Sequence, residues 1–284
     1  MNETIFPSSE SKTTSSFPTT GSMYCWPRGF FLSTPTFVLN RGEHPTRRPS
    51  IRIMLCARDH FDIELSDGTW LTSQAVLMSA KVKRRQIIAI NCDFALFDFA
   101  VSTSEYAALA PLLTEHDVVQ LPVNRLSSIL PEFAIGRAHA LKESEVLELR
   151  QRLVYTITGK RCSPPDYDPR VESALQIIHQ LPLEEVKLNG LAKAVHLSPD
   201  RFRHLFKQNV GCTYSHYART SAVWKALMHW SKGKRLTEIA HEVGFHDYSH
   251  FNHAFQEMFG FNPSVVTEMQ NFEFIFLIEN VIRE

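Results

Sequence analysis

Three absences narrow what this chain of 284 residues can be. No run of about 18 apolar residues occurs, so the sequence predicts no membrane-spanning helix. The formal net charge is zero, so bulk charge favours no polyanionic partner. The sequence contains no Cys-x-x-Cys pair. Scattered single cysteines are typical of free thiols in a reducing cytoplasm and do not indicate a disulfide framework. The five single cysteines are Cys25, Cys56, Cys92, Cys162 and Cys212.

The first half of the chain has the composition of a β-rich domain. Residues 1–22 are rich in serine, threonine and proline and are expected to be a disordered lead-in without a signal peptide. Between residues 23 and 158, short β-branched and aromatic runs predict strands at 37–39, 51–56, 61–65, 86–90 and 94–101, with a turn at Asp67-Gly68. Helical periodicity follows at residues 106–113 and 143–157, and the apolar face of the second helix needs a partner, either the β domain or a second subunit. These features predict a β-sandwich or small barrel with trailing helices.

A linker at residues 159–168 separates this half from a helical one, because it combines glycine and prolines with polar residues. Asp168 and Pro169 then supply an N-cap and a first-turn proline. The remainder, residues 169–284, is expected to be helices with short breaks.

The helical half contains an internal repeat. Leu188, Leu191, Ala192 and Val195 recur as Leu236, Ile239, Ala240 and Val243, and then Phe202, Arg203, His204, Phe206 and Gly211 recur as Phe251, Asn252, His253, Phe255 and Gly260. Each copy predicts a short helix with a buried alanine, a tight turn, and a second helix that opens with a polar N-cap and closes at glycine. A long helix over residues 213–231 joins the copies. Two helix-turn-helix units in matching order favour DNA binding over an ordinary helical bundle.

The repeat resembles the DNA-binding region of the AraC/XylS family of transcription regulators. Residues 191–207 resemble that family's first helix-turn-helix, residues 239–256 its second, and residues 259–264 its closing signature. The resemblance implies an α+β chain with a cupin-like sensing and dimerisation domain at 23–158 and an all-α DNA-binding domain at 169–284. It implies double-stranded promoter DNA as partner, together with RNA polymerase, a small-molecule effector, and a homodimer contact through the N-terminal half.

Helical periodicity divides the side chains of the two recognition helices. Phe202, Leu205 and Phe206 in the first, and Phe251, Ala254 and Phe255 in the second, are expected to face the core. The side chains expected to face DNA are Asp200, Arg201, Arg203, His204, Lys207, Tyr248, Ser249, Asn252, His253 and Gln256. By resemblance, the base contacts fall on Asp200, Arg203, His204, Ser249, Asn252 and His253. Arginine forms paired hydrogen bonds with guanine, and asparagine does so with adenine. Asp200 has an alternative role as an acidic residue in the first turn of the helix, where the helix dipole stabilises a negative charge.

The charge is distributed unevenly between the two units. From Lys187 to Arg235 the only acidic residue is Asp200, whereas from Leu236 onward the only basic residue is Arg283. Because phosphate attraction supplies much of DNA affinity, the first unit is expected to dominate binding. Histidines of the helical half are expected to strengthen binding as the pH falls toward 6.

Two alternatives involve other chemistry. His246, His250 and His253 are spaced along one helical face, as metal ligands are, although DNA-facing histidines have the same spacing. Cys56 and Cys92 are candidate nucleophiles of a thiol-dependent sensor or repair protein with a residual DNA-binding domain. The sequence lacks the zinc-type cysteine cluster of such repair proteins. It also lacks a Cys-His signature and a P-loop. We therefore expect a cytoplasmic regulator that is not an enzyme and has no metal and no cofactor.

Overall fold

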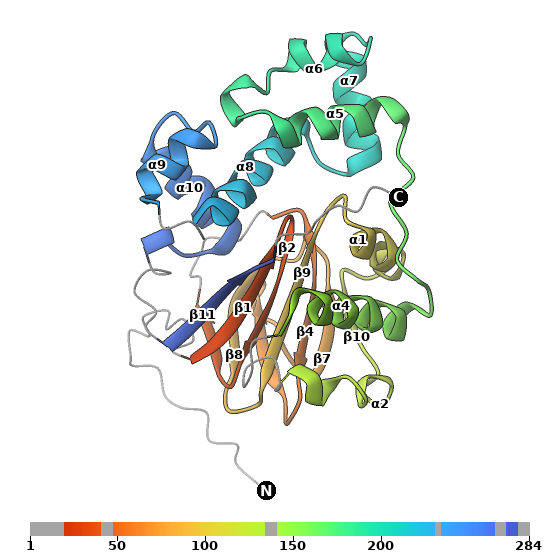
Figure 1. Cartoon of the computed structure of the whole chain (residues 1–284). Helices are drawn as coiled ribbons and strands as arrows, with labels where there is room; N and C mark the ends of the chain where they lie inside the picture. The colour runs from red at the N-terminus through yellow and green to blue at the C-terminus, as the bar shows by residue number, and fades with distance from the viewer. Residues whose placement is uncertain (1–19, 41–47, 134–140, 231–233, 265–270, 278–284) are drawn as a thin grey trace, which may run out of the picture.

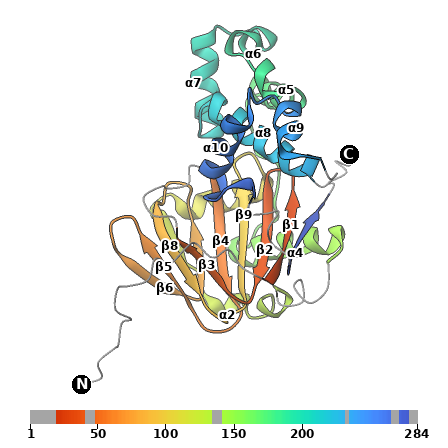
Figure 2. The same cartoon turned by 90° about the vertical axis from the view of Figure 1, so that its left-hand side faces the viewer.

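The computed structural model describes residues 20–40, 48–133, 141–230, 234–264 and 271–277. They form a β domain, residues 20–158 with 271–277, and a helical domain, residues 169–264, which lies across one end of the β domain (Figures 1 and 2). Residues 159–168 between them have neither helix nor strand. In the part of the chain that is described, no helix combines the length and the apolar character needed to cross a membrane.

The β domain consists of two sheets. The larger has the strand order β10-β7-β4-β9-β2-β1-β11, formed by Val118–Gln120, Ala75–Met78, Ser50–Cys56, Phe94–Ala100, Gly29–Thr34, Thr20–Trp26 and Asn271–Phe276. The smaller has the order β3-β8-β5-β6, formed by Phe37–Asn40, Arg84–Ala89, Phe61–Leu65 and Trp70–Ser73. The predicted cupin-like β-sandwich is confirmed, and each of the five predicted strands is present.

Alternating side chains of the larger sheet serve two different cores. In β4, Met54 and Cys56 join the core between the sheets, whereas Ile51, Ile53 and Leu55 pack under the helices on the other face. These helices include α1 (Ser104–Leu109), the 3-10 helix η1 (Ala110–Leu113), α2 (Val123–Leu126) and α4 (Glu143–Thr158). Because both faces are buried, the central strands are nearly continuous apolar runs. The apolar face of α4 therefore covers the sheet of its own subunit.

A buried ion pair fixes α4 to α1. Arg150 donates to Glu105, with its Nε 3.1 Å from Oε1, and its guanidinium lies 4.1 Å from the ring centre of Trp26. Both charged side chains are almost fully buried. The ion pair and the cation–π contact together hold the trailing helix in one register on the sheet.

Three sequence-based expectations about this half need correction. Cys56 and Cys92 are not separate thiols but form a disulfide with a Cα–Cα distance of 5.5 Å. The two cysteines are 36 positions apart in the sequence, which gave no hint of a bond between them. They meet because β4 pairs with β9, and this pairing ends at Cys56 and Phe94.

The expected disordered lead-in overlaps β1, which already begins at Thr20. Residues 1–19 lie outside the described residues.

The third correction concerns the end of the chain, which was assigned to the DNA-binding domain. Instead, β11 pairs in parallel with β1 and extends the large sheet, as Figure 1 shows. Its Phe274 and Phe276 pack against the core between the sheets, and Ile275 packs on the other side. The chain therefore returns to the β domain after the second helix-turn-helix.

The helical domain contains six helices among the described residues. They are α5 (Pro169–Gln180), α6 (Leu188–Ala194), α7 (Pro199–Val210), α8 (Tyr214–Trp230), α9 (Leu236–Glu242) and α10 (Tyr248–Phe259), with a 3-10 turn η2 (Leu183–Glu185) after α5. The predicted linking helix is α8, and it joins the α6–α7 unit to the α9–α10 unit (Figure 1).

The two domains share a core. Phe30 of β2 packs against Trp224 of α8 and Phe259 of α10, with ring centres 6.3 and 6.2 Å apart. Two turns earlier on the same face of α8, the hydroxyl of Tyr217 lies 2.8 Å from Oγ of Ser102 in the β domain. The second recognition helix is thus in direct contact with the β domain.

Candidate nucleic-acid interface

Side-chain and glycine caps set the limits of both recognition helices. Ser198 caps α7 by accepting from the backbone nitrogen of Arg201 at 3.3 Å, and Asp247 caps α10 by accepting from that of His250 at 2.8 Å. Both helices end at glycines in the left-handed conformation, Gly211 at φ 82° and Gly260 at φ 85°. The predicted caps and stops are confirmed, and they make the two helices equal in length.

The predicted inward faces are also confirmed, with one exception. Phe202, Phe206, Phe251, Ala254 and Phe255 are buried, as are Ala192 and Ala240 at the helix contacts of the two units. Leu205 is only half-buried at the edge of the first core. Two buried phenylalanines four residues apart therefore help to anchor each recognition helix.

The predicted DNA-facing residues lie on the outer faces of α7 and α10. Asp200, Arg201, Arg203, His204 and Lys207 are all exposed on α7. On α10, Ser249, His253 and Gln256 are exposed, whereas Tyr248 and Asn252 are half-buried. Arg203 forms an ion pair with Asp200 at 2.6 Å, and Gln256 hydrogen-bonds to Asn262. Both side chains must leave these partners to reach a base.

Several basic residues of the helical domain already have partners within the protein. Lys225 donates to the carbonyls of Ile178 and Leu181 at the end of α5, and burial lowers its pKa. Arg219 pairs with Glu257, Lys234 with Glu242, and Arg235 with Glu238. In the described part of the chain, no ion pair involves Lys193, Arg201 or Lys207. The positive charge that can reach phosphates is therefore concentrated on α6 and α7.

A glycine fixes how the two units are joined. Gly244, in the turn between α9 and α10, has φ +87°, and a Cβ there would lie 2.8 Å from the backbone nitrogen of Glu184 in η2. The backbone nitrogen of Leu183 donates to the carbonyl of Val243 at 2.9 Å. The turn of the second unit therefore packs backbone to backbone against the segment that leads into the first.

One histidine does not behave as the sequence suggested. His179 lies at the domain boundary with its Nε2 2.8 Å from the hydroxyl of Tyr217. Burial, with the nearby charges of Arg28 and Lys225, lowers its pKa to about 3. His179 therefore stays neutral near pH 6 and adds no charge toward DNA.

A second polar site is buried between the sheets, at the end near the helical domain. Asp98 of β9 lies opposite Arg52 of β4 and Phe30 of β2 in register. One oxygen of Asp98, Oδ2, lies 2.6 Å from Nη2 of Arg48, 2.9 Å from Oγ of Ser50 and 3.5 Å from Nε of Arg52. Among the described residues, Nη1 and Nη2 of Arg52 have no hydrogen-bond partner.

The charges of this cluster do not balance. Two arginines share one carboxylate, and the exposed fractions are 3% for Arg48 and 0% for Arg52 and Asp98. Burial lowers the pKa of Arg48 to about 10 and lowers that of Arg52 as well, in both cases against the attraction of Asp98. A surplus cation in a low-dielectric core is costly, so an anion bound beside it would be stabilised.

This cluster also touches the DNA-binding domain. The guanidinium of Arg48 lies 5.1 Å from the ring centre of Phe30 and 5.2 Å from that of Phe259, the last residue of α10. A change in the position of Arg48 would therefore be transmitted to the second recognition helix. Sequence reasoning missed these residues, because nothing in the runs around Arg48 and Arg52 indicates that both side chains are buried.

The candidate nucleophiles of the alternative hypothesis are not available as thiolates. Cys56 and Cys92 are bonded to each other, and each has an exposed fraction of 0%. A catalytic thiol must be accessible and ionised to attack a substrate.

Comparisons with known proteins agree with this geometry. A helix-turn-helix domain family matches residues 191–269. The arabinose operon regulatory protein of Salmonella typhimurium is 29% identical over 131 residues, which are 45% of this chain and 46% of that protein. Its Escherichia coli counterpart is 29% identical over 102 residues, 35% of each chain. This chain thus spans less than half the length of the curated relatives it matches.

The likeness to solved structures extends over both domains. ToxT from Vibrio cholerae O395 superposes with a TM-score of 0.52 at 11% identity, covering 84% of this chain and 97% of ToxT. At this identity the likeness shows the fold alone. The fold and the interface define a double helix-turn-helix protein with an N-terminal cupin-like domain. The helix-turn-helix match over residues 191–269 and the likeness to the two arabinose operon regulatory proteins support the predicted resemblance to the AraC/XylS family of transcription regulators.

Proposed function

We propose that this protein is a transcription regulator that binds double-stranded promoter DNA in the cytoplasm through α7 and α10. The observation that carries the proposal is the pair of matched, capped helices with exposed polar outer faces, joined by one rigid helix. Two such helices can enter successive major grooves, about 34 Å apart, on one side of a duplex. The family resemblance supports two further partners, RNA polymerase and a second copy of the chain that binds through the N-terminal half.

Arg203 and Lys207 are expected to contribute differently to DNA binding. We expect Arg203→Ala to lose about 1–3 kcal/mol on the specific site, with the loss confined to one base position. Lys207→Ala should weaken all sequences alike and reduce the salt dependence by about one counterion, because lysine contacts phosphate. Fluorescence anisotropy on the operator and on scrambled DNA, over a salt series, measures both effects.

The matched control is Lys83→Ala, since Lys83 is an exposed lysine of the β domain. It should leave DNA affinity unchanged. Identical losses for Arg203→Ala and Lys207→Ala on both duplexes would contradict the division into base reader and phosphate contact. No salt dependence at all would contradict DNA binding itself.

We further propose that the effector is a small carboxylic acid with an apolar body, bound beside Arg48 and Arg52. The unbalanced charge of the Asp98 cluster and the apolar core around it support this chemistry. ToxT, whose fold this chain shares, has been crystallised with (E)-4-(8-methylnaphthalen-1-yl)but-3-enoic acid. The contact of Arg48 with Phe259 gives such an effector a route to the second recognition helix.

Octanoate tests the proposed effector chemistry. We expect the full chain to bind octanoate and not octanol in a calorimetric titration, because only the acid supplies an anion. Arg52→Met should weaken octanoate binding by about 10–100-fold, since a hydrogen bond to a charged group contributes about 1.5–3 kcal/mol. Equal binding of acid and alcohol, or unchanged affinity in Arg52→Met, would contradict the assignment of the cluster as an anion site.

A further inference from the structure

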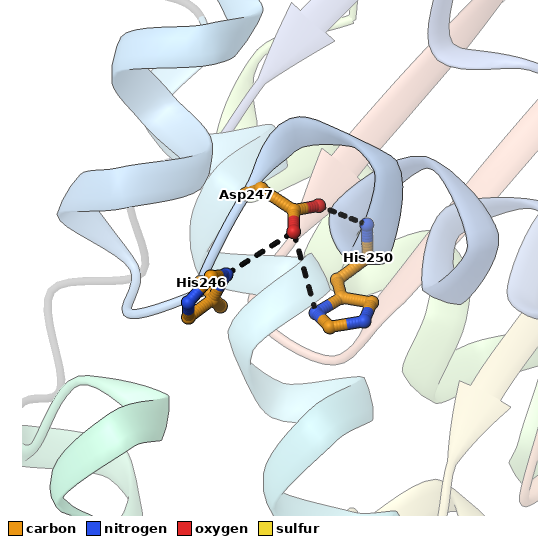
Figure 3. Close-up of side chains that lie close together, drawn as sticks. All are labelled: His246, Asp247 and His250. Atoms are coloured by element: carbon orange, nitrogen blue, oxygen red, sulfur yellow. Dashed lines mark hydrogen bonds and ion pairs between the residues drawn. The ribbon is translucent and has the colours of Figure 1, made fainter.

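Three side chains gather at the start of the second recognition helix. Asp247 uses Oδ1 to cap α10, which leaves Oδ2 facing the imidazoles of His246 and His250 (Figure 3). Oδ2 lies 3.2 Å from Nδ1 of His246 and 3.8 Å from Nδ1 of His250. One ligand atom from each residue lies within 4.8 Å of the others. All three side chains are reached by solvent, so an ion with its waters can enter without opening the fold.

The spacing of these atoms suits a small transition-metal ion. Zinc bonds imidazole nitrogen and carboxylate oxygen at about 2.0–2.2 Å, so two ligand atoms of a tetrahedral ion are about 3.3 Å apart. The 3.2 Å between Oδ2 of Asp247 and Nδ1 of His246 already matches this separation. A small rotation of the exposed His250 ring would shorten the 3.8 Å between its Nδ1 and the same oxygen to match as well. Imidazole and carboxylate together are a ligand set that Zn²⁺ accepts readily.

The structure changes the membership of the histidine group noted in the sequence. His253 is not part of the cluster; its Nδ1 lies 4.0 Å from Glu257, one turn further along α10. Asp247 takes its place, because an N-cap residue turns its side chain back over the first turn of the helix. The candidate ligands therefore comprise two imidazoles and one carboxylate.

We propose that His246, Asp247 and His250 bind Zn²⁺ and that the bound ion strengthens the contact of the second helix-turn-helix with DNA. The second unit needs such a cation, because residues 236–264 contain no lysine or arginine but contain Glu238, Glu242, Asp247 and Glu257. A zinc ion beside Tyr248 and Ser249 places two positive charges at the proposed DNA face. Three protein ligands leave a coordination position open, which a phosphate oxygen can fill.

The position at a helix N-terminus requires the carboxylate. The N-terminal end of a helix carries a partial positive charge that disfavours a cation. Asp247 offsets that charge and supplies the anionic ligand. Removing its charge while keeping the cap is therefore the sharpest single change, and Asp247→Asn does so because asparagine caps helices as well as aspartate.

The metal site is tested by calorimetric titration of the full chain with ZnCl₂ in a buffer free of chelators. We expect the wild type to bind one more equivalent of Zn²⁺ than His250→Ala does at the same concentration. Asp247→Asn should bind that equivalent more weakly by about 10–100-fold, no less than the loss of an outer-shell partner usually costs. His241→Ala is the matched control, because His241 is an exposed histidine of α9 outside the cluster. Equal stoichiometry and affinity in His250→Ala and wild type would overturn the site.

The consequence for DNA is measured separately, by anisotropy on the operator at fixed ionic strength with and without ZnCl₂. We expect Zn²⁺ to tighten binding of the wild type several-fold and to extend the footprint over the second subsite, with no effect on His250→Ala. Zinc binding that leaves the DNA affinity of the wild type unchanged would overturn the regulatory part. This part rests on the proposed function, whereas the titration without DNA does not, so the two failures are distinguishable.

Discussion

Replacing Asp98 by asparagine is expected to lower the free energy of unfolding by about 3–5 kcal/mol. The substitution keeps the shape of the side chain but leaves Arg48 and Arg52 buried together without a carboxylate. Two unpaired cations in a low-dielectric core repel each other and cannot be hydrated. Urea denaturation of the purified full chain, followed by circular dichroism, measures the loss.

Asp67→Asn is the control for this experiment. Asp67 lies in the exposed turn before β6, where it accepts a hydrogen bond from the backbone of Thr69 at 2.9 Å. Its substitution should change the stability by no more than about 0.5 kcal/mol. If Asp98→Asn is equally mild, the two arginines are not buried against this carboxylate. If it is severe, added octanoate should recover part of the loss, because the anion takes over the role of the missing charge.

Gly244→Ala is expected to destabilise the chain by about 2–5 kcal/mol, the sum of strain at positive φ and overpacking. The new methyl group would meet the backbone at the start of η2, including the nitrogen of Glu184 at 2.8 Å and the carbonyl carbon of the preceding Pro182 at 2.9 Å. A backbone segment cannot move aside as a flexible side chain can. The two units must then shift relative to each other, so the footprint should lose its second subsite. Urea denaturation and footprinting provide the two measurements.

Gly211→Ala separates the two causes. Gly211 also has positive φ, at +82°, but no atom lies within 4 Å of an added Cβ. It should therefore cost only the conformational strain, about 1 kcal/mol, and leave both subsites occupied. Equal losses for the two substitutions would show that the contact between Gly244 and η2 does not fix the units.

The DNA-binding half was predictable from the sequence in considerable detail. Its repeat predicted two helices with polar N-caps and glycine stops, and the structure has these caps at Ser198 and Asp247 and these stops at Gly211 and Gly260. These features depend on residues close in sequence, since a cap bonds to a backbone group two or three positions away. The same locality made the inward faces of α7 and α10 readable from a period of 3.6 residues.

The β domain was predictable in type but not in its connections. Five strands were found from β-branched and aromatic runs, but β1, β2, β6, β7, β10 and β11 were not. The last strand pairs with the first across almost the whole length of the chain. No local pattern encodes such a pairing, because the partner of a strand is chosen by the assembled sheet.

By itself, the sequence determined the two helix-turn-helix units, their outward residues and the uneven charge between them, because helix periodicity, caps and charge are local properties. Only the tertiary structure decided which of those charges remain available to DNA, since Arg219 and Lys225 are taken up by partners from other helices. It also brought Arg48, Arg52 and Asp98 into one buried cluster and paired Cys56 with Cys92. Those contacts join residues tens of positions apart, and they exist only once the strands have paired and the helical domain has packed against their end.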